Sequence, residues 1–372
     1  MVVLWYGLVP MAGALVKRYK WHIFRRRFDE LRLSPILDYS QYSQQGMDAG
    51  TFRFVGGFES VTDGQTLWIR GEDLTVPVSL QNAETYLLPM QKGDGIPEVF
   101  EPGDEAPEKI RWERVSALTE EAKVYVGGLL TCRDGRLSFA STKENPLMVI
   151  FYDGPDHSLT TRAIRAGRHL GEYWNAITPY SLVIGALCLI LMAVSFLSRP
   201  AFRLTVIVSI IALFIPLYPM IPPGLLFTVM YRRLAWRSRI LRSYRDLARL
   251  PLRYLPPAGK GILPNGERYG YTCSAELPLQ AQEGKIPLLL PELKKAKGGN
   301  LWYIFGALRP GEELPVQPKD SFATFGILPN RPETLVKRYG IAAYALEVIA
   351  WIILFVGIGL NIFFLRMVLV LL

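Results

Sequence analysis

The architecture of this chain follows from the stretch Pro179–Met230, which reads PYSLVIGALCLILMAVSFLSRPAFRLTVIVSIIALFIPLYPMIPPGLLFTVM. Its first run, Pro179–Leu197, has 19 residues without a charge, and its second run, Leu204–Met230, has 27. A helix of about 20 apolar residues crosses a hydrocarbon core of about 30 Å, so each run is long enough to span a bilayer. Only the short polar break Ser198–Arg203 separates them. The stretch therefore predicts a helical hairpin, and the segments before and after it lie on the same side of the membrane.

The composition fits a multi-pass membrane protein. The chain has 372 residues, a net charge of +9 and 50% hydrophobic residues, and this length suggests two or three domains. Its basic clusters adjoin the apolar runs, so we expect anionic lipid headgroups as partners, and other membrane or cytoplasmic proteins, but not nucleic acid. The three cysteines, Cys132, Cys188 and Cys273, are far apart. They predict no disulfide framework and no zinc ribbon, and they favour a reducing compartment.

The N-terminal segment Met1–Val16 is apolar but short for a span. We expect a short anchor with its N-terminus outside; a re-entrant or surface-lying segment and a removed signal peptide are the alternatives. From Val16 to Leu31 apolar residues recur at three- and four-residue steps, with Lys and Arg on the other face. This pattern predicts an amphipathic helix. It suits either the headgroup layer or a helix packed on the next domain.

The region 50–177 is β-rich and contains a repeat. Phe54-Val55-Gly56-Gly57-Phe58 and Tyr125-Val126-Gly127-Gly128-Leu129 are each followed by Asp-Gly, eight residues after the valine. Asp-Gly between apolar runs is a strong hairpin signal, so we predict duplicated hairpins at 54–69 and 125–139 in a small barrel or sandwich. Leu147–Tyr152 predicts a buried strand. We expect a mobile loop over Gln91–Pro107 and a helix over Thr160–Ala176.

The chain after this region alternates again between apolar and soluble segments. Four prolines crowd the second run and predict a break or kink there, either as a functional gate or as the end of an overlong span. An arginine-rich amphipathic helix follows the run, and a second β-rich segment is expected to pack on the first or complete it. The expected segments are 1–16, 17–49, 50–177, 179–230, 231–255, 256–339 and 341–372. The last of these is expected to be the third transmembrane helix.

Candidate site residues come from the basic clusters and from one acid. Eight arginines beside the apolar runs are expected to contact anionic lipid: Arg25, Arg26, Arg27, Arg232, Arg233, Arg237, Arg239 and Arg242. Glu347 lies one or two turns inside the C-terminal span, and an acid at this place is a candidate functional residue. The alternatives are that it reaches the interface or pairs with Arg338.

Motifs of known chemistry are not found in the sequence. Gly259-Lys260-Gly261 fails the phosphate-loop pattern, because Tyr254 stands where the first glycine is needed. The sequence has no zinc-protease, nucleophile-elbow or dinucleotide motif. His157 and His169 have acidic neighbours, which a tight turn and a helical pair explain as well as a metal site. We therefore expect no catalytic, cofactor or metal residues.

The sequence thus predicts three transmembrane helices, with residues 1–16 as a candidate fourth, and a β-rich module at the cytoplasmic face of the cell membrane. The first functional hypothesis is a non-enzymatic interaction or assembly protein that holds this module at the membrane. The alternative is a transport or lipid-handling protein that uses the proline-broken span and Glu347. A membrane-bound hydrolase is a weaker third hypothesis, because no nucleophile–base pattern occurs.

Overall fold

The computed structural model describes residues 1–42, 50–63, 65–88, 107–110, 122–133, 136–220, 222–255, 260–277, 286–290 and 301–371. The chain divides into two compact units. The helical unit comprises Met1–His22, Gly167–Ser243 and Arg338–Leu372. The β unit comprises Ile23–Ala166 and Tyr244–Lys337, so both β-rich segments of the sequence belong to one unit.

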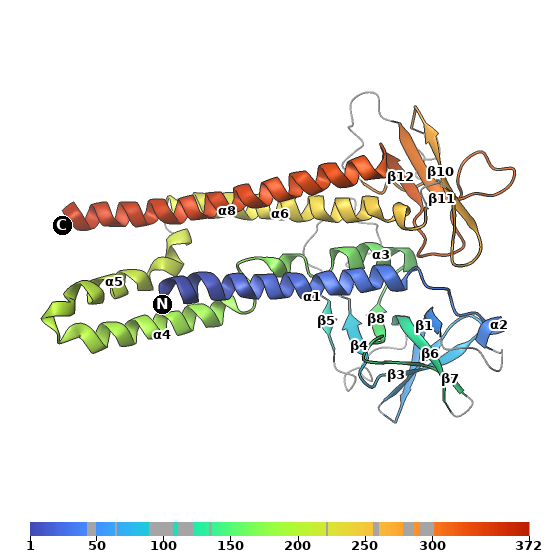
Figure 1. Cartoon of the computed structure of the whole chain (residues 1–372), viewed down its shortest axis with the longest axis horizontal. Helices are drawn as coiled ribbons and strands as arrows, with labels where there is room; N and C mark the ends of the chain where they lie inside the picture. Colours follow the sequence, from blue (N-terminus) through green and yellow to red (C-terminus); the bar gives the residue numbers. More distant parts are fainter. Residues whose placement is uncertain are drawn as a thin grey trace. The chain divides into compact units, whose positions relative to one another are not determined.

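The helical unit contains the predicted hairpin. Helices α4 (Thr178–Leu197) and α5 (Arg203–Leu213) are joined by the short helix η4 (Pro200–Phe202) and lie side by side (Figure 1). Three stretches among the described residues are long and apolar enough to cross a membrane: Thr178–Leu197, Pro200–Leu217 and Pro332–Phe364. Each has an apolar surface almost all round, which is typical of a membrane span.

The proline cluster ends the second of these helices. α5 stops at Leu213, the 3₁₀ turn η5 (Ile215–Met220) follows, and α6 (Gly224–Arg249) begins just after Pro222-Pro223. Proline lacks the backbone N–H that a helix interior needs, so the break is the expected consequence. The predicted 27-residue second span is therefore shorter, and residues 224–230 open the arginine-rich helix instead.

The N-terminal apolar segment is helical and packs on α4. The π-helix η1 (Val3–Leu8) leads directly into α1 (Val9–Leu31), and the Val9 N–H donates to the Leu4 carbonyl at the wide π step. Pro10 has no N–H to give to Trp5 or Tyr6. The Trp5 carbonyl accepts instead from the Ser181 hydroxyl of α4. The Tyr6 carbonyl accepts from the Tyr173 hydroxyl in the segment before α4.

Helices α6 and α8 (Pro332–Leu371) run antiparallel within the helical unit. The Gly224 N–H donates to Asn361 Oδ1 at 3.3 Å, and the Ser238 hydroxyl donates to the Ala343 carbonyl at 2.7 Å. Tyr231 packs between these contacts against α8. The basic helix predicted for 231–255 corresponds to the later part of α6, which ends at Arg249. The 3₁₀ turn η6 (Pro251–Arg253) follows it.

The β unit is built on a closed ring of five strands, in the order β1-β2-β3-β7-β6 and back to β1. The bounds are β1 (Gly50–Thr62), β2 (Thr66–Arg70), β3 (Thr75–Ser79), β6 (Lys123–Arg133) and β7 (Arg136–Ala140). The β3–β7 pair is parallel and the other pairs are antiparallel. The β1–β6 pairing closes the ring into a small barrel. It encloses a core that includes Phe52, Phe54, Val124 and Val126, so the barrel alternative of the sequence is the one observed.

Both predicted hairpins exist, but they are not equivalent. β1 and β2 are joined by three residues and β6 and β7 by two, as their end pairs Thr62↔Thr66 and Arg133↔Arg136 show. Phe54 points into the barrel core, whereas Tyr125, its partner in the repeat, packs outside it against Phe28. Since neighbouring residues of a strand face opposite sides, the glycine pairs of the repeat do not mark matching positions.

The sheet continues beyond the ring through three further strands. β8 (Met148–Tyr152) is buried at every residue, as predicted, and joins β6 to β4 (Glu84–Leu87) and then β5 (Glu108–Lys109). α3 (Asp156–Arg165) follows β8, and Gly167 has a φ of +66°. The helix predicted for 160–176 therefore ends at Arg165, because glycine in this conformation stops a helix. The predicted mobile loop lies almost wholly outside the described residues.

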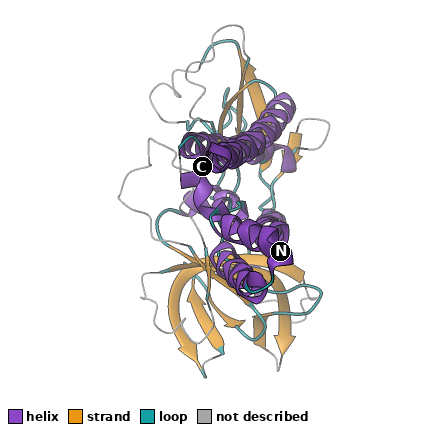
Figure 2. Ribbon diagram, turned by 90° about the vertical axis from the view of Figure 1, so that its left-hand side faces the viewer, coloured by secondary structure: helices purple, strands orange, loops and turns teal. Residues whose placement is uncertain are grey.

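A second sheet of four antiparallel strands completes the β unit (Figure 2). Its order is β12-β11-β10-β9, with bounds β9 (Lys260–Ile262), β10 (Arg268–Ser274), β11 (Trp302–Ala307) and β12 (Gly326–Pro329). The segment that leads into β12 packs on the barrel strand β6 through Phe322 and Tyr125, whose ring centroids are 5.4 Å apart. The second β-rich segment therefore forms a sheet of its own instead of completing the first, and it meets the barrel through the residues just before β12.

The C-terminal part of α1 and two short helices complete the helical elements that the structure describes. The short helices are α2 (Tyr39–Tyr42) and η3 (His169–Gly171). The helix predicted over Val16–Leu31 is part of α1, and Phe24, Phe28 and Leu31 on its apolar face are buried. Phe24 contacts Tyr86 of β4 with ring centroids 4.7 Å apart. This part of the helix packs on the β unit, the second of the two alternatives that the sequence left open.

A candidate anion-binding pocket

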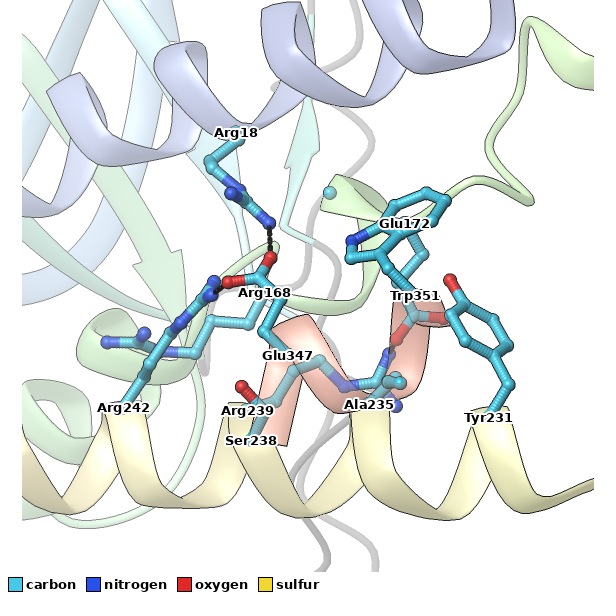
Figure 3. A pocket seen from close by; sticks show the side chains of 12 residues that line it. Arg18, Arg168, Glu172, Tyr231, Ala235, Ser238, Arg239, Arg242, Glu347 and Trp351 are labelled. Carbon is cyan, nitrogen blue, oxygen red and sulfur yellow. Dashed lines mark hydrogen bonds and ion pairs between the residues drawn. The ribbon is translucent and has the colours of Figure 1, made fainter. Parts of the chain in front are cut away.

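A pocket with many arginines lies within the helical unit, where α1, α6, α8 and the segment before α4 meet (Figure 3). Its empty volume is about 380 Å³, including solvent at its open side. Charged side chains from all four segments line it, together with a few small and aromatic residues. The lining consists of Arg18, Arg168, Gly171, Glu172, Tyr231, Ala235, Ser238, Arg239, Arg242, Glu347, Ala350 and Trp351.

Glu347 of α8 lies between two of these arginines. One carboxylate oxygen accepts from Arg18 of α1 and the other from Arg242 of α6. The Glu347 side chain is 19% exposed, so both ion pairs lie in partly desolvated surroundings. Of the three alternatives for this acid, the structure gives a pairing with arginines, but not with Arg338.

Glu172 forms the second ion pair of the pocket, with Arg239. Burial raises the pKa of the Glu172 carboxyl above its ordinary value, and the positive charges of Arg239 and Arg232 oppose this rise. Burial also raises the pKa of the nearby Tyr231 hydroxyl to about 12, and the charge of Glu172 adds to this effect. The Arg239 Nε is buried without a hydrogen-bond partner, so one donor of this guanidinium is unused.

The local fold explains how Glu172 reaches the pocket. Gly167 turns the chain out of α3, and a Cβ at this position would lie 2.2 Å from the Trp21 ring. Asn175 then holds the segment beside α1, because its side-chain amide donates to the Pro10 carbonyl at 3.0 Å and to the Glu172 carbonyl at 3.0 Å. The segment 167–175 thereby carries Arg168 and Glu172 to one place.

The aromatic wall of the pocket comes from α6 and α8. The rings of Tyr231 and Trp351 have centroids 5.8 Å apart, and Trp351 stacks on Phe355 at 6.0 Å. The small residues Ala235 and Ala350 leave room between the helices. The pocket is therefore lined by apolar side chains on one side and by charged side chains on the other.

The charges that line the pocket do not balance. Four guanidinium groups face two carboxylates, which leaves an excess of two positive charges. Guanidinium groups present planar forks of N–H donors that match phosphate and carboxylate oxygens. The arrangement is suited to binding an anion of one or two charges.

The structure places the predicted site residues in three settings. Arg239 and Arg242 line the pocket with Glu347, and Arg232, Arg233 and Arg237 are exposed on the same helix. The other three belong to the β unit and have partners there: the Ala166 carbonyl for Arg25, Glu30 for Arg26 and Glu84 for Arg27. Contact of these arginines with lipid stays a prediction.

Three charged residues of the pocket were not among the predicted site residues. They are Arg18, Arg168 and Glu172. Arg18 belongs to the basic cluster that follows the N-terminal apolar segment, and Glu172 directly precedes the aromatic pair Tyr173-Trp174. These are signals for the membrane interface, but they do not indicate which charges meet.

Among the described residues, no group of three or more His, Cys, Asp or Glu side chains could hold a metal ion. His157 is the second residue of α3, and His169 is the first residue of η3. Comparison of the chain with protein-family models, with curated proteins and with solved structures gives no match.

Proposed function

We propose that this chain is a multi-pass membrane protein that binds an anionic ligand in the arginine pocket and so belongs to the lipid- or anion-handling class. The observation that carries the proposal is the pocket itself, where four arginines from three segments face only two acids. Guanidinium groups gathered in a partly buried pocket cost free energy unless anions offset their charge. An anionic ligand supplies the missing negative charge.

The membrane location is supported by the surfaces of the three apolar helices. Only 17%, 17% and 22% of the residues in their most apolar windows are buried within the molecule. Soluble monomers rarely expose apolar patches of this extent, because water around them costs free energy. Lipid covers such surfaces without this cost.

The depth of the pocket is supported by the sequence of α8. Between Glu347 and Arg366 lie 18 residues without a charge, which extend about 27 Å in a helix. This length nearly equals the hydrocarbon thickness of about 30 Å. Glu347 and the pocket then lie at the level of the lipid headgroups, and Arg366 lies at the opposite interface.

The orientation is supported by the distribution of basic residues. The exposed Arg232, Arg233 and Arg237 follow the hairpin, whereas its connecting loop holds only Arg199 and Arg203. Under the positive-inside rule the basic side is cytoplasmic. The proposal therefore places the protein in the cell membrane, with the pocket and the β unit on the cytoplasmic side.

Anion binding is tested by calorimetric titration of the full chain in neutral detergent at low salt, with inorganic phosphate as the probe. We expect one site with saturable binding. Replacing Arg239 by Gln should weaken it by about tenfold or more, as expected when one charge-assisted contact is lost. Arg237→Gln is the matched control, since Arg237 is exposed on the same helix and does not line the pocket. Equal binding by both variants would contradict the proposal.

A second candidate function is that of an interaction or assembly protein. It is favoured by the course of the chain, which passes between the helical unit and the β unit four times, after His22, Ala166, Ser243 and Lys337. Such a chain ties the β unit to the membrane at several points. Affinity purification of the wild type and of Arg239→Gln separates the two functions, because an assembly role predicts the same co-purifying proteins for both.

A further inference from the structure

We infer that the anion held by this pocket is the phosphomonoester headgroup of a membrane lipid, of the phosphatidic acid type. This inference rests on the proposed function, because it names the ligand of the same pocket. Three features carry it: the charge of the lining, the geometry of its donors and the apolar path that leaves the pocket.

The charge of the lining matches a phosphomonoester. The four arginines exceed the two glutamates by two positive charges. A phosphomonoester carries about −1.5 to −2 charges near pH 7, because its second pKa is about 6, whereas a phosphodiester carries about one. Only the monoester neutralises the whole excess.

The donors of the lining suit a terminal phosphate. Arg18 reaches the pocket from α1, Arg168 from the segment before α4, and Arg239 and Arg242 from α6 (Figure 3). A terminal phosphate has three oxygens free to accept from guanidinium forks on different sides. The Arg239 Nε is buried and has no hydrogen-bond partner among the described residues, so the pair with Glu172 leaves one donor of this guanidinium unused.

An apolar path joins the charged lining to the outer surface of α8. Trp351 lines the pocket and stacks on Phe355, with ring centroids 6.0 Å apart. Phe355 is 59% exposed, and Ile352 beside it is 55% exposed. A ligand with its phosphate among the arginines can therefore lay acyl chains on this face of α8. Free phosphate would contact the arginines but would leave this apolar face without a ligand.

The crowding of charged side chains in the pocket also favours a small headgroup. Four large arginine side chains and two glutamates line it. A bare phosphate needs little more space than its oxygens and their donors occupy. A headgroup that carries a sugar would have to displace the ion pairs of Glu172 and Glu347.

The test uses the delipidated full chain in neutral detergent and native mass spectrometry. The probes are dioctanoyl phosphatidic acid, phosphatidylglycerol and phosphatidylcholine at equal concentrations. We expect one tightly bound phosphatidic acid, with an affinity about tenfold above that of phosphatidylglycerol, because one further charged contact is worth about this factor. Phosphatidylcholine should bind no more than background.

Two kinds of variant should move the affinity for phosphatidic acid in opposite directions. Arg168→Gln and Arg239→Gln each remove a donor and should lower it by about tenfold. Glu347→Gln removes the carboxylate that occupies Arg18 and Arg242, so it should raise the affinity severalfold. A purely structural role of these residues predicts losses in every variant. Arg237→Gln should leave the preference for phosphatidic acid over phosphatidylglycerol unchanged.

The outcomes separate this inference from the proposed function. Equal affinity for phosphatidic acid and phosphatidylglycerol would overturn the monoester assignment. Saturable binding of inorganic phosphate, with no gain for any lipid, would leave the anion pocket standing and overturn the lipid assignment. Binding of neither phosphate nor anionic lipid would overturn both. A fall in affinity on Glu347→Gln in a chain of unchanged melting temperature would also contradict the inference.

Discussion

Arg53 and Asp320 form a buried ion pair between two segments that are 267 residues apart in the sequence. Arg53 lies on the barrel strand β1, and Asp320 precedes β12 of the second sheet. Their side chains are 1% and 0% exposed. The Arg53 guanidinium also lies over the Phe322 ring, 5.3 Å from its centroid. The pair thus joins the β-rich segment before the helical hairpin to the one after it.

We expect Asp320→Asn to destabilise the chain by about 3–5 kcal/mol, because it leaves the buried charge of Arg53 without its partner. Loss of the ion pair should lower the melting temperature of the purified full chain, measured by fluorescence in detergent. Glu30→Gln is the control, since it breaks the exposed pair of Arg26 and Glu30 and should cost at most about 0.5 kcal/mol. Similar losses in both variants would show that the buried pair contributes nothing special.

The second prediction concerns the carbonyl of Tyr6, which accepts from the Tyr173 hydroxyl because Pro10 offers it no N–H. Tyr173→Phe should cost about 1–3 kcal/mol, the usual penalty for a buried acceptor without a partner. In a Pro10→Ala background the new N–H can serve this carbonyl, and the cost should fall below about 1 kcal/mol. Unfolding of the four proteins of this cycle gives the coupling.

The control for this cycle is Tyr180→Phe, because Tyr180 lies on α4 with 72% exposure. It should have no measurable effect in either background. If Tyr173→Phe costs the same with and without Pro10, the proline is not the reason for the contact. The N-terminal segment would then owe its π-helix to packing alone.

Local patterns predicted most of the elements, because they depend on neighbours in the sequence. The Asp-Gly turns gave both hairpins, the proline cluster gave the end of α5, and the run Leu147–Tyr152 gave β8. The helix expected beyond Arg165 ends before Gly167, which has a positive φ and lies so close to the Trp21 ring that a Cβ would clash with it; this contact is distant in the sequence. Hairpin register was also out of reach, since one residue more or less in a turn reverses the faces of a strand.

The pocket could not be predicted in the same way, because its residues come from four separate segments. The sequence marks Arg18, Arg239 and Glu347 as charges beside apolar runs. It does not indicate which opposite charge each of them pairs with, because the chain contains many acids and arginines. The pairing of Glu347 with Arg18 depends on the antiparallel packing of α6 and α8 and on the contact of the N-terminal helix with α4. Such packing is a property of the folded chain.

The third prediction is a pH dependence of anion binding that arises at Glu172. Its folded pKa is raised by burial, so it takes up a proton at a higher pH than an exposed glutamate as the pH falls. Neutral Glu172 releases Arg239 and adds one net positive charge to the pocket. Sulfate, whose charge is constant from about pH 8 to about pH 5, should therefore bind more tightly as the pH decreases toward this pKa.

Calorimetric titration with sulfate at several pH values measures this effect. Arg239, Arg232 and Tyr231 face Glu172, and burial raises the pKa of Tyr231 to about 12, above this range. Glu172→Gln should bind sulfate more tightly than the wild type near neutral pH and should lose the pH dependence. A pH dependence that survives in Glu172→Gln would contradict this assignment, and its loss in His169→Gln would assign the effect to the histidine instead.

The last prediction tests the membrane topology with the protein's own cysteines. Cys132 and Cys273 are both exposed, and both belong to the β unit. A hairpin that crosses twice returns the chain to the same side, so the two thiols must share a compartment. Under the proposed orientation, which follows the positive-inside rule, we expect this compartment to be the cytoplasm. Cys188 lies within α4, one of the three helices long and apolar enough to cross a membrane, so an impermeant reagent should not reach it.

A membrane-impermeant maleimide should therefore leave the protein unlabelled in intact cells and should label it twice in inside-out vesicles. Cys132→Ser and Cys273→Ser each remove one of the two labels and assign them. Labelling of one thiol from each side would break the hairpin model, because an odd number of crossings would then separate β7 from β10. Labelling of both from outside would keep the hairpin and reverse its orientation, which would place the arginine pocket at the outer leaflet.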